Sequence, residues 1–422
     1  MKKIIASAVG LMLVGGVAVT TASAVESQFG GYWRTRMYFE DNFTQADSAQ
    51  NATDTRTRLY YTAKFNDNFK FVNKFEFNST WGDNNGGDIG TDGKGNFRIK
   101  NSYVDFTMGM VNATVGLQGS VISHGFIFDD DYAGATVTAD FGMVKVPVLY
   151  AAVSAEDADD LGWDGSVADT VSFSVDRLAV GSFGGGNGDI HMLSIMPQFN
   201  VGDSFKITPH ATWATITEQD SDVYWVGVDA DMKFDAFSGW ATGIYNGGSI
   251  DNGPNTPDTD ISAFLLAAGA DAGLVHGQAF YASGDDDAND NDLESFVQVG
   301  GNGYGASYYW SEILGLGIFD NNVDGMIGDK ISNIWAVNAG VTFKPMDKLS
   351  LNFDAWYVQL AEERLAYNNR MEDELGTELD AKVTYALMDD LSADVVFAYL
   401  IAGDATGPED VMEGGVRLSL KF

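Results

Sequence analysis

Basic side chains alternate with apolar ones in the stretch RTRLYYTAKFNDNFKFVNKFEFN, residues 56–78. Every arginine and lysine in it has an even number, whereas Leu59, Tyr61 and five phenylalanines have odd numbers. Guanidinium groups bind anions by bidentate hydrogen bonds, and ammonium groups bind them as point charges. A period of two is typical of a β-strand, because successive side chains point to opposite faces. The stretch therefore predicts two strands, joined by a turn at 66–68, with one apolar face and one basic face.

Carboxylates gather in two other stretches, HGFIFDDDYAG at 124–134 and GDDDANDND at 284–292, and we expect both to be loops. Ca²⁺ takes several oxygen ligands from clusters of this kind. The spacing lacks the glycine and the terminal glutamate of an EF-hand loop, so solvated surface charge is the alternative interpretation. The candidate calcium ligands are Asp285, Asp286, Asp287, Asp290 and Asp292.

Motifs for catalysis or for a redox cofactor are not evident in the sequence. The chain has no cysteine, which excludes a disulfide framework, a thiolate nucleophile and a CxxCH haem site. Its four histidines are scattered without HExxH spacing, and no GxSxG elbow or P-loop stands out. Ser123 and His124 are adjacent, and on a strand they would point to opposite faces. We expect no enzyme and no required cofactor.

The first residues predict an exported protein. MKK is followed by the apolar IIASAVGLMLVGGVAV and by the small-residue pattern Ala22-Ser23-Ala24. We interpret 1–24 as a secretory signal peptide and 25–422 as one mature domain. An N-terminal membrane helix is the alternative, and polar strand-like sequence directly after it disfavours that interpretation. No later segment reaches the roughly 18 consecutive apolar residues of a transmembrane helix.

Charge and composition restrict the function classes further. The chain has 60 acidic and 24 basic residues, a formal net charge of −36, so a nucleic-acid partner is excluded. Glycine is plentiful at 49 residues, proline is scarce at 7, and aromatic residues make up 13% of the chain. This composition favours many strands with open loops over helices.

Segments with a period of two recur from end to end, the signature of a transmembrane barrel. Short connections alternate with long ones, as in barrels with short periplasmic turns and long extracellular loops. We predict a single antiparallel up-and-down β-barrel of about 18 strands, with 16 as the alternative count. A soluble β-sandwich would also alternate, but the chain shows no linker at which it would divide into domains. The predicted strands are 29–40, 55–65, 69–79, 96–107, 112–121, 134–141, 145–155, 188–200, 205–217, 222–234, 237–246, 259–271, 274–283, 331–344, 349–360, 376–387, 391–401 and 411–422.

The last strand, EGGVRLSLKF, ends in Phe422 and resembles the C-terminal assembly signal of Gram-negative outer-membrane barrels. FYASGDDDANDNDLESF at 280–296 and GTELDAKVTYALMDDLSADVVFAYL at 376–400 are similar to the alginate-export type of porin. The resemblance implies an 18-stranded barrel in the outer membrane. Its partners would be lipid, lipopolysaccharide, the barrel-assembly machinery, small hydrophilic solutes and, in some porins, further copies of the chain.

In such a barrel the apolar face of each strand meets lipid and the basic face lines the lumen. Closure of the barrel would bring the last strand beside the first, so one wall would carry a ladder of basic residues. Such rows attract anions, and the alternative is that these side chains simply pair with acids such as Glu76, Glu378 and Asp380. The predicted pore-lining residues are Arg34, Arg36, Arg56, Arg58, Lys64, Lys70, Lys74, Arg98, Lys100, Arg417 and Lys421.

These inferences predict a porin for passive diffusion, possessing a lumen narrowed by the long loops 156–187 and 284–330. The lumenal ladder would favour anions. The alternative is a barrel that sheathes or scaffolds an outer-membrane complex, such as a porin–cytochrome electron conduit, in which a separate subunit would carry the haem.

Overall fold

The computed structural model describes residues 25–43, 49–82, 97–154, 190–216, 221–252, 256–287, 290–299, 308–319 and 331–422. The predicted signal peptide, 1–24, and the predicted loop 156–187 lie outside the described residues. No helix in the described part of the chain is long and apolar enough to cross a membrane.

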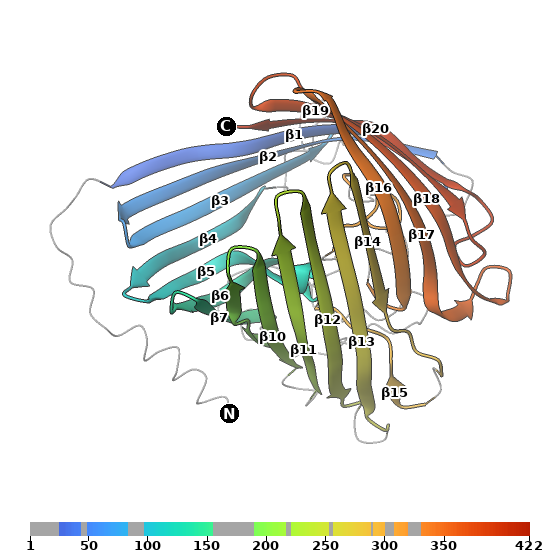
Figure 1. Ribbon diagram of the computed structural model, residues 1–422, viewed down its shortest axis with the longest axis horizontal. Coiled ribbons are helices and arrows are strands. Elements are labelled where there is room, and N and C mark those ends of the chain that lie inside the picture. The colour runs from blue at the N-terminus through green and yellow to red at the C-terminus, as the bar shows by residue number, and fades with distance from the viewer. Residues whose placement is uncertain are drawn as a thin grey trace.

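Twenty strands in the described part of the chain form one sheet, which closes on itself because β1 pairs with both β2 and β20 (Figure 1). The strands are β1 (Glu26–Asp41), β2 (Ala49–Asn66), β3 (Phe69–Thr80), β4 (Phe97–Met108), β5 (Val111–Ile122), β6 (Phe128–Asp140), β7 (Val144–Ser154), β8 (Ile190–Ile195), β9 (Gln198–Val201), β10 (Phe205–Ile216), β11 (Ser221–Lys233), β12 (Phe237–Ile250), β13 (Thr259–Ala272), β14 (Val275–Ala282), β15 (Asp292–Leu293), β16 (Ile334–Met346), β17 (Leu349–Leu365), β18 (Met371–Ala386), β19 (Leu391–Ala402) and β20 (Val411–Lys421).

The barrel wall consists of 18 strands once two exceptions are considered. This number confirms the predicted fold class and favours 18 over the alternative of 16. β8 and β9 are two halves of one wall strand, since both pair with β7 and β10. They are separated at Pro197, which has no N–H to donate to the ladder. The two-residue β15 pairs in parallel with the end of β13 and stands outside the count.

Side chains alternate between the two faces of the wall, as the period of two predicts. On β13 Leu265 is fully buried, whereas its neighbour Leu266 is 56% exposed. Phe353, Phe397 and Val416 are likewise exposed apolar side chains on β17, β19 and β20. A closed barrel satisfies the backbone hydrogen bonds of its strands within the sheet. An apolar band around its outside is suited to contact with lipid. The fold is therefore a transmembrane barrel.

The predicted alternation of short turns and longer connections is confirmed where the structure describes it, although β2 begins before the predicted strand 55–65 and β17 ends after the predicted strand 349–360, which shortens the adjoining connections. The chain ends beside its beginning, because Gly31 N donates to Phe422 O (2.6 Å) and Phe422 N donates to Gly31 O (3.2 Å). Figure 1 shows this seam, where red β20 lies next to blue β1. Phe422 therefore lies at the end of the barrel that carries the short turns. Its role as an assembly signal stays a prediction.

One sequence prediction is wrong around residue 124. The acidic stretch 124–134 was expected as a loop, but β6 begins at Phe128 and carries Asp129, Asp130 and Asp131. Carboxylates are tolerated on this strand because Asp131 forms an ion pair with Lys100. Ser123 and His124 do not alternate as on a strand, because they form a short turn, η1 (Ser123–Gly125), with positive φ of 52° and 54°.

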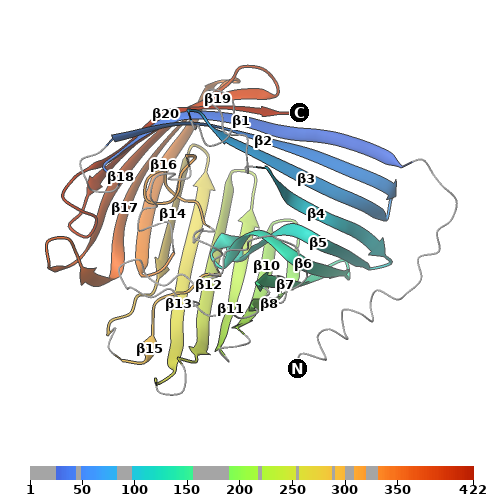
Figure 2. The same cartoon turned by 180° about the vertical axis from the view of Figure 1, so that it is seen from behind.

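Two of the connecting segments that the structure describes fold into the lumen and pack against each other. The first is 122–128, which includes η1 at the end of β5 (Figure 2). The second is made of the described parts of loop 284–330, which confirms that this predicted loop enters the barrel. We call its residues 308–319 the inner segment. Phe126 stacks on Tyr308 with ring centroids 4.0 Å apart, and Trp225 Nε1 on β11 donates to Val297 O at 2.7 Å.

The two faces of β20 should respond differently to an added charge. Leu418→Arg, on the apolar face, should destabilise the barrel by about 2–4 kcal/mol near the bilayer midplane, and Ser419→Arg, on the lumenal face, by far less. The measurement is the heat-modifiable fraction of assembled barrel on cold detergent gels. Equal losses from both variants would contradict the assignment of faces.

Candidate pore lining

The predicted basic residues lie on one wall of the lumen, formed by β20, β1, β2, β3 and β4. Arg34 lies directly opposite Arg56 in the β1–β2 register, and Arg36 lies opposite Arg417 in the β1–β20 register. The barrel closure therefore brings the last strand into this wall, as the sequence predicted. Exposure along the wall varies widely, from 3% for Arg36 to 57% for the Arg98 side chain.

Three arginines on this wall share one carboxylate. Glu76 on β3 is fully buried. Its Oε2 accepts a 2.6 Å hydrogen bond from Arg58 Nε, its Oε1 pairs with Arg98, and Arg56 Nε lies 3.6 Å away. Three guanidinium groups around one carboxylate keep a net positive charge. The group spans β2, β3 and β4, and we call Arg56, Arg58, Glu76 and Arg98 the arginine cluster.

Arg36 has a structural role that the sequence did not indicate. Its Nε donates to both carboxylate oxygens of Asp54, at 3.0 Å each, and its Nη1 donates to the carbonyl oxygen of Ile318 at 2.9 Å. Its guanidinium also lies 5.5 Å from the ring centroid of Tyr38, which stacks on Phe319. Arg36 therefore fastens the inner segment to β1.

Other members of the basic set pair locally with acids. Lys70 Nζ lies 3.2 Å from Asp105 and Arg417 Nη2 lies 2.9 Å from Asp394. Lys64 pairs with Asp67 in the neighbouring short turn, at 2.7 Å. Lys100 pairs with Asp131, Lys74 lies 5.4 Å from the ring centroid of Tyr60, and Lys421 is exposed at the end of β20.

The alternative interpretation, in which the ladder pairs with acids, is confirmed for Glu76 and wrong for Glu378. Glu378 on β18 is fully buried and accepts hydrogen bonds from Ile313 N at 2.6 Å, Leu314 N at 3.0 Å and Ser311 Oγ at 3.0 Å. Its carboxylate therefore binds the inner segment and not an arginine of the ladder. Arg36 on β1 and Glu378 on β18 are thus two of the residues that fasten the inner segment to the wall.

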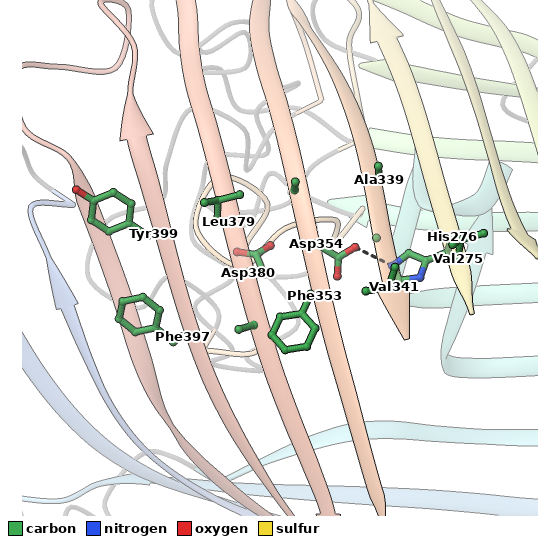
Figure 3. Close-up of a pocket in the computed structure, with 13 residues that line it drawn as sticks. Val275, His276, Ala339, Val341, Phe353, Asp354, Leu379, Asp380, Phe397 and Tyr399 are labelled. Carbon is green, nitrogen blue, oxygen red and sulfur yellow. Dashed lines mark hydrogen bonds and ion pairs between the residues drawn. The ribbon is translucent and has the colours of Figure 1, made fainter. Parts of the chain in front are cut away.

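The opposite wall is acidic and aromatic, and sequence reasoning missed it. Asp229 and Asp231 on β11, Asp271 on β13 and Asp354 on β17 lie on its lumenal side. His276 on β14 contacts Asp354, with Nε2 and Oδ1 2.7 Å apart (Figure 3). The signal was present in the sequence, because His276, Gln278, Asp354 and Trp356 stand at alternate positions of their strands.

The outside of the same strands has a shallow apolar depression (Figure 3). Its rim consists of Val341, Phe353, Leu379 and Phe397, all of them exposed. The small residues Ala339, Ala355 and Ala381 form its floor. The depression is part of the lipid-facing band and separates lipid from the polar lumenal side of β16–β18.

Ser123 and His124 both point toward the acidic wall. Ser123 Oγ donates to Asp229 Oδ1 at 2.7 Å. The His124 ring nitrogens lie 2.9 Å from Thr242 Oγ1 and 3.0 Å from Asp231 Oδ1. These contacts tie the first inward segment to β11 and β12. The serine hydroxyl is directed at a carboxylate, which is not the arrangement of a serine–histidine nucleophile.

The acidic loop brings two of the five predicted calcium ligands together. Carboxylate oxygens of Asp285, Asp286 and Glu294 lie within 4.8 Å of one another. Burial raises the pKa of Asp285 above its usual value, and the neighbouring carboxylates of Asp290 and Asp286 raise it further. Asp290 Oδ1 instead accepts from the backbone N–H of Asp292 at 2.9 Å. Calcium binding stays a prediction.

A closed lipid-facing barrel with inward segments defines the class of transmembrane β-barrels. No family model and no curated protein matches this chain. Solved structures do match it. OpdQ of Pseudomonas aeruginosa is 12% identical, with 94% of this chain and 98% of that chain covered and a TM-score of 0.61.

Two further structures show the same likeness. OccAB4 of Acinetobacter baumannii is 12% identical, with 94% and 98% of the two chains covered and a TM-score of 0.60. A BenF-like porin from Pseudomonas fluorescens Pf-5 is 11% identical, with the same coverage and a TM-score of 0.57. The chain thus has the fold of Gram-negative outer-membrane porins, which confirms the general resemblance. The similarity to the alginate-export type stays a prediction.

Proposed function

We propose that this chain is an outer-membrane porin that lets small hydrophilic solutes diffuse passively and favours anions on the path along the basic wall. It performs no reaction and requires no cofactor in this proposal. Its surroundings are outer-membrane lipid and lipopolysaccharide, its assembly uses the barrel-assembly machinery, and the proposal allows a homo-oligomer.

The arginine cluster is the observation that carries the proposal. Like charges placed directly opposite on neighbouring strands destabilise a sheet. Arg34 nevertheless lies opposite Arg56, beside a cluster in which three arginines share the carboxylate of Glu76. Water in the lumen reduces the repulsion between these arginines, and an anion that passes through the lumen would reduce it further.

The inward segments favour a porin over a sheath for a cytochrome. The inner segment and residues 122–128 occupy the lumen and bury large side chains there, including Phe126, Ile313 and Leu314. A multihaem subunit would need that space. Segments that narrow an aqueous channel are, in contrast, what a solute-selective pore requires.

The test is single-channel recording of the purified protein in a planar bilayer with a salt gradient. We expect discrete conductance steps and a reversal potential on the anion-selective side. Absence of any conductance from correctly assembled barrel would overturn the porin proposal. A cation-selective reversal potential would overturn only the anion preference and would show that the acidic wall dominates.

A further inference from the structure

The acidic and aromatic wall contains a cavity of about 280 Å³, to whose lining the inner segment contributes Trp310. Trp240 on β12, Trp310 on the inner segment and Trp356 on β17 line it, together with polar side chains of β13, β14, β16 and β17. Small-molecule sites begin at roughly 300 Å³ and combine an apolar lining with a few placed polar groups. This cavity has the size and the mixed lining for one small ring.

Trp240 lines one side of the cavity as an aromatic platform, and the rings of His124 and Phe126 pack against it with centroids 5.1 Å and 6.0 Å from its own. It is half-buried, whereas Trp310 and Trp356 are 8% and 2% exposed. The indole of Trp240 lies against Gly269 on β13, where an added Cβ would be 2.5 Å from its Nε1. Only glycine lets the ring lie this close to the strand. Trp310 packs edge-on to Trp356, with ring centroids 4.8 Å apart, and this contact holds both rings in place in the cavity lining.

The polar groups around the platform include both donors and acceptors. Asp354 Oδ1 is held by His276 Nε2 at 2.7 Å and by Asn338 Nδ2 at 3.0 Å. Gln278 accepts a hydrogen bond from Tyr308 through its carbonyl oxygen, which leaves its NH₂ group as a donor. Asp271 is exposed at the cavity, with Ser238 Oγ 3.4 Å from its carboxylate.

We propose that this cavity binds the ring of an uncharged polyhydroxylated solute, one saccharide unit, with a C–H face on Trp240 and hydroxyl groups on Asp271 and Gln278. A hydroxyl both donates and accepts, so it suits a site that offers a carboxylate and an amide NH₂. Asp354 is already engaged by His276 and Asn338, so Asp271 is the carboxylate that would accept from a ligand hydroxyl. The aromatic platform supplies the apolar contact.

The proposal deepens the proposed function and rests on it in one respect, because the solute reaches the cavity through the lumen. It names a class of passenger different from the anions that the basic wall attracts. Neutral rings and anions would then contact opposite walls of one channel.

The experiment measures glucose binding in two independent ways on the full barrel. One is the block of single-channel current by added glucose. The other is saturation-transfer NMR from the detergent-solubilised barrel to glucose, which requires no conductance. We expect millimolar binding by wild type, and binding about tenfold weaker in Trp240→Ala, corresponding to the loss of one aromatic contact. Gln278→Leu should also weaken binding while leaving the aromatic platform intact.

Trp335→Ala is the matched control, because Trp335 packs edge-on to Tyr357 on the neighbouring strand, away from the cavity. Its binding of glucose should equal that of wild type. Glucose binding that is absent in wild type, or equal in Trp240→Ala and wild type, would overturn the proposal. Binding of tetramethylammonium in place of glucose would show a cation site and overturn it too. Failure of conductance with intact NMR binding would count against the porin proposal alone.

Discussion

Replacing Arg34, Arg56, Arg58 and Arg98 with glutamine, together with Glu76→Gln, is expected to shift the reversal potential toward cations. The change removes four positive charges and one negative charge from adjacent strands of one wall. Including Glu76→Gln avoids leaving a fully buried carboxylate without its guanidinium partners. At the physiological Debye length of about 8 Å, charges lining a narrow path outweigh those on distant loops. Arg36 is retained because it fastens the inner segment.

The matched control removes the same net charge from exposed positions near the short turns. Lys233→Gln, Lys344→Gln and Lys348→Gln together take away three positive charges outside the arginine cluster. This variant should keep the reversal potential of wild type. A shift of equal size in both variants would mean that net charge, and not the wall, sets selectivity. An unchanged potential in the cluster variant would show that the arginines are only solvated wall.

Glu378→Ala is expected to release the inner segment and to give larger, noisier single-channel currents. The carboxylate accepts from Ile313 N, Leu314 N and Ser311 Oγ, so its loss leaves two buried backbone N–H groups without their acceptor. Each unsatisfied group costs about 1–3 kcal/mol. The contacts of Arg36 with Ile318 O and of Tyr308 with Gln278 would still hold the two ends of the inner segment. The measurement is conductance and open-channel noise in the bilayer.

Glu374→Ala is the control for that prediction, because Glu374 is exposed on the same strand. It removes the same charge from β18 without touching the contacts to the inner segment, and its currents should match wild type. Glu378→Gln retains a carbonyl acceptor and should give an intermediate result. Wild-type noise in Glu378→Ala would show that the inner segment is held by its apolar packing alone.

The sequence by itself determined the wall of the barrel. A strand between lipid and a wet lumen must alternate apolar and polar side chains, so its pattern is local and can be read without knowing its neighbours. Leu59 and Arg58 already reveal which face of β2 is outside. The same logic gave the 18 strands, the short turns and the side of the lumen on which Arg34, Arg56 and Arg98 lie.

Only the tertiary structure decided what fills the lumen and which side chains meet there. The contacts of Arg36 with Ile318, and of Glu378 with Ile313, join residues 282 and 65 positions apart. The wall of His276, Asp354 and Trp240 likewise forms only when distant strands are placed side by side. Such contacts depend on how the inward segments fold inside a closed barrel. A period of two specifies a face of the sheet, but it carries no information about the partner across the lumen.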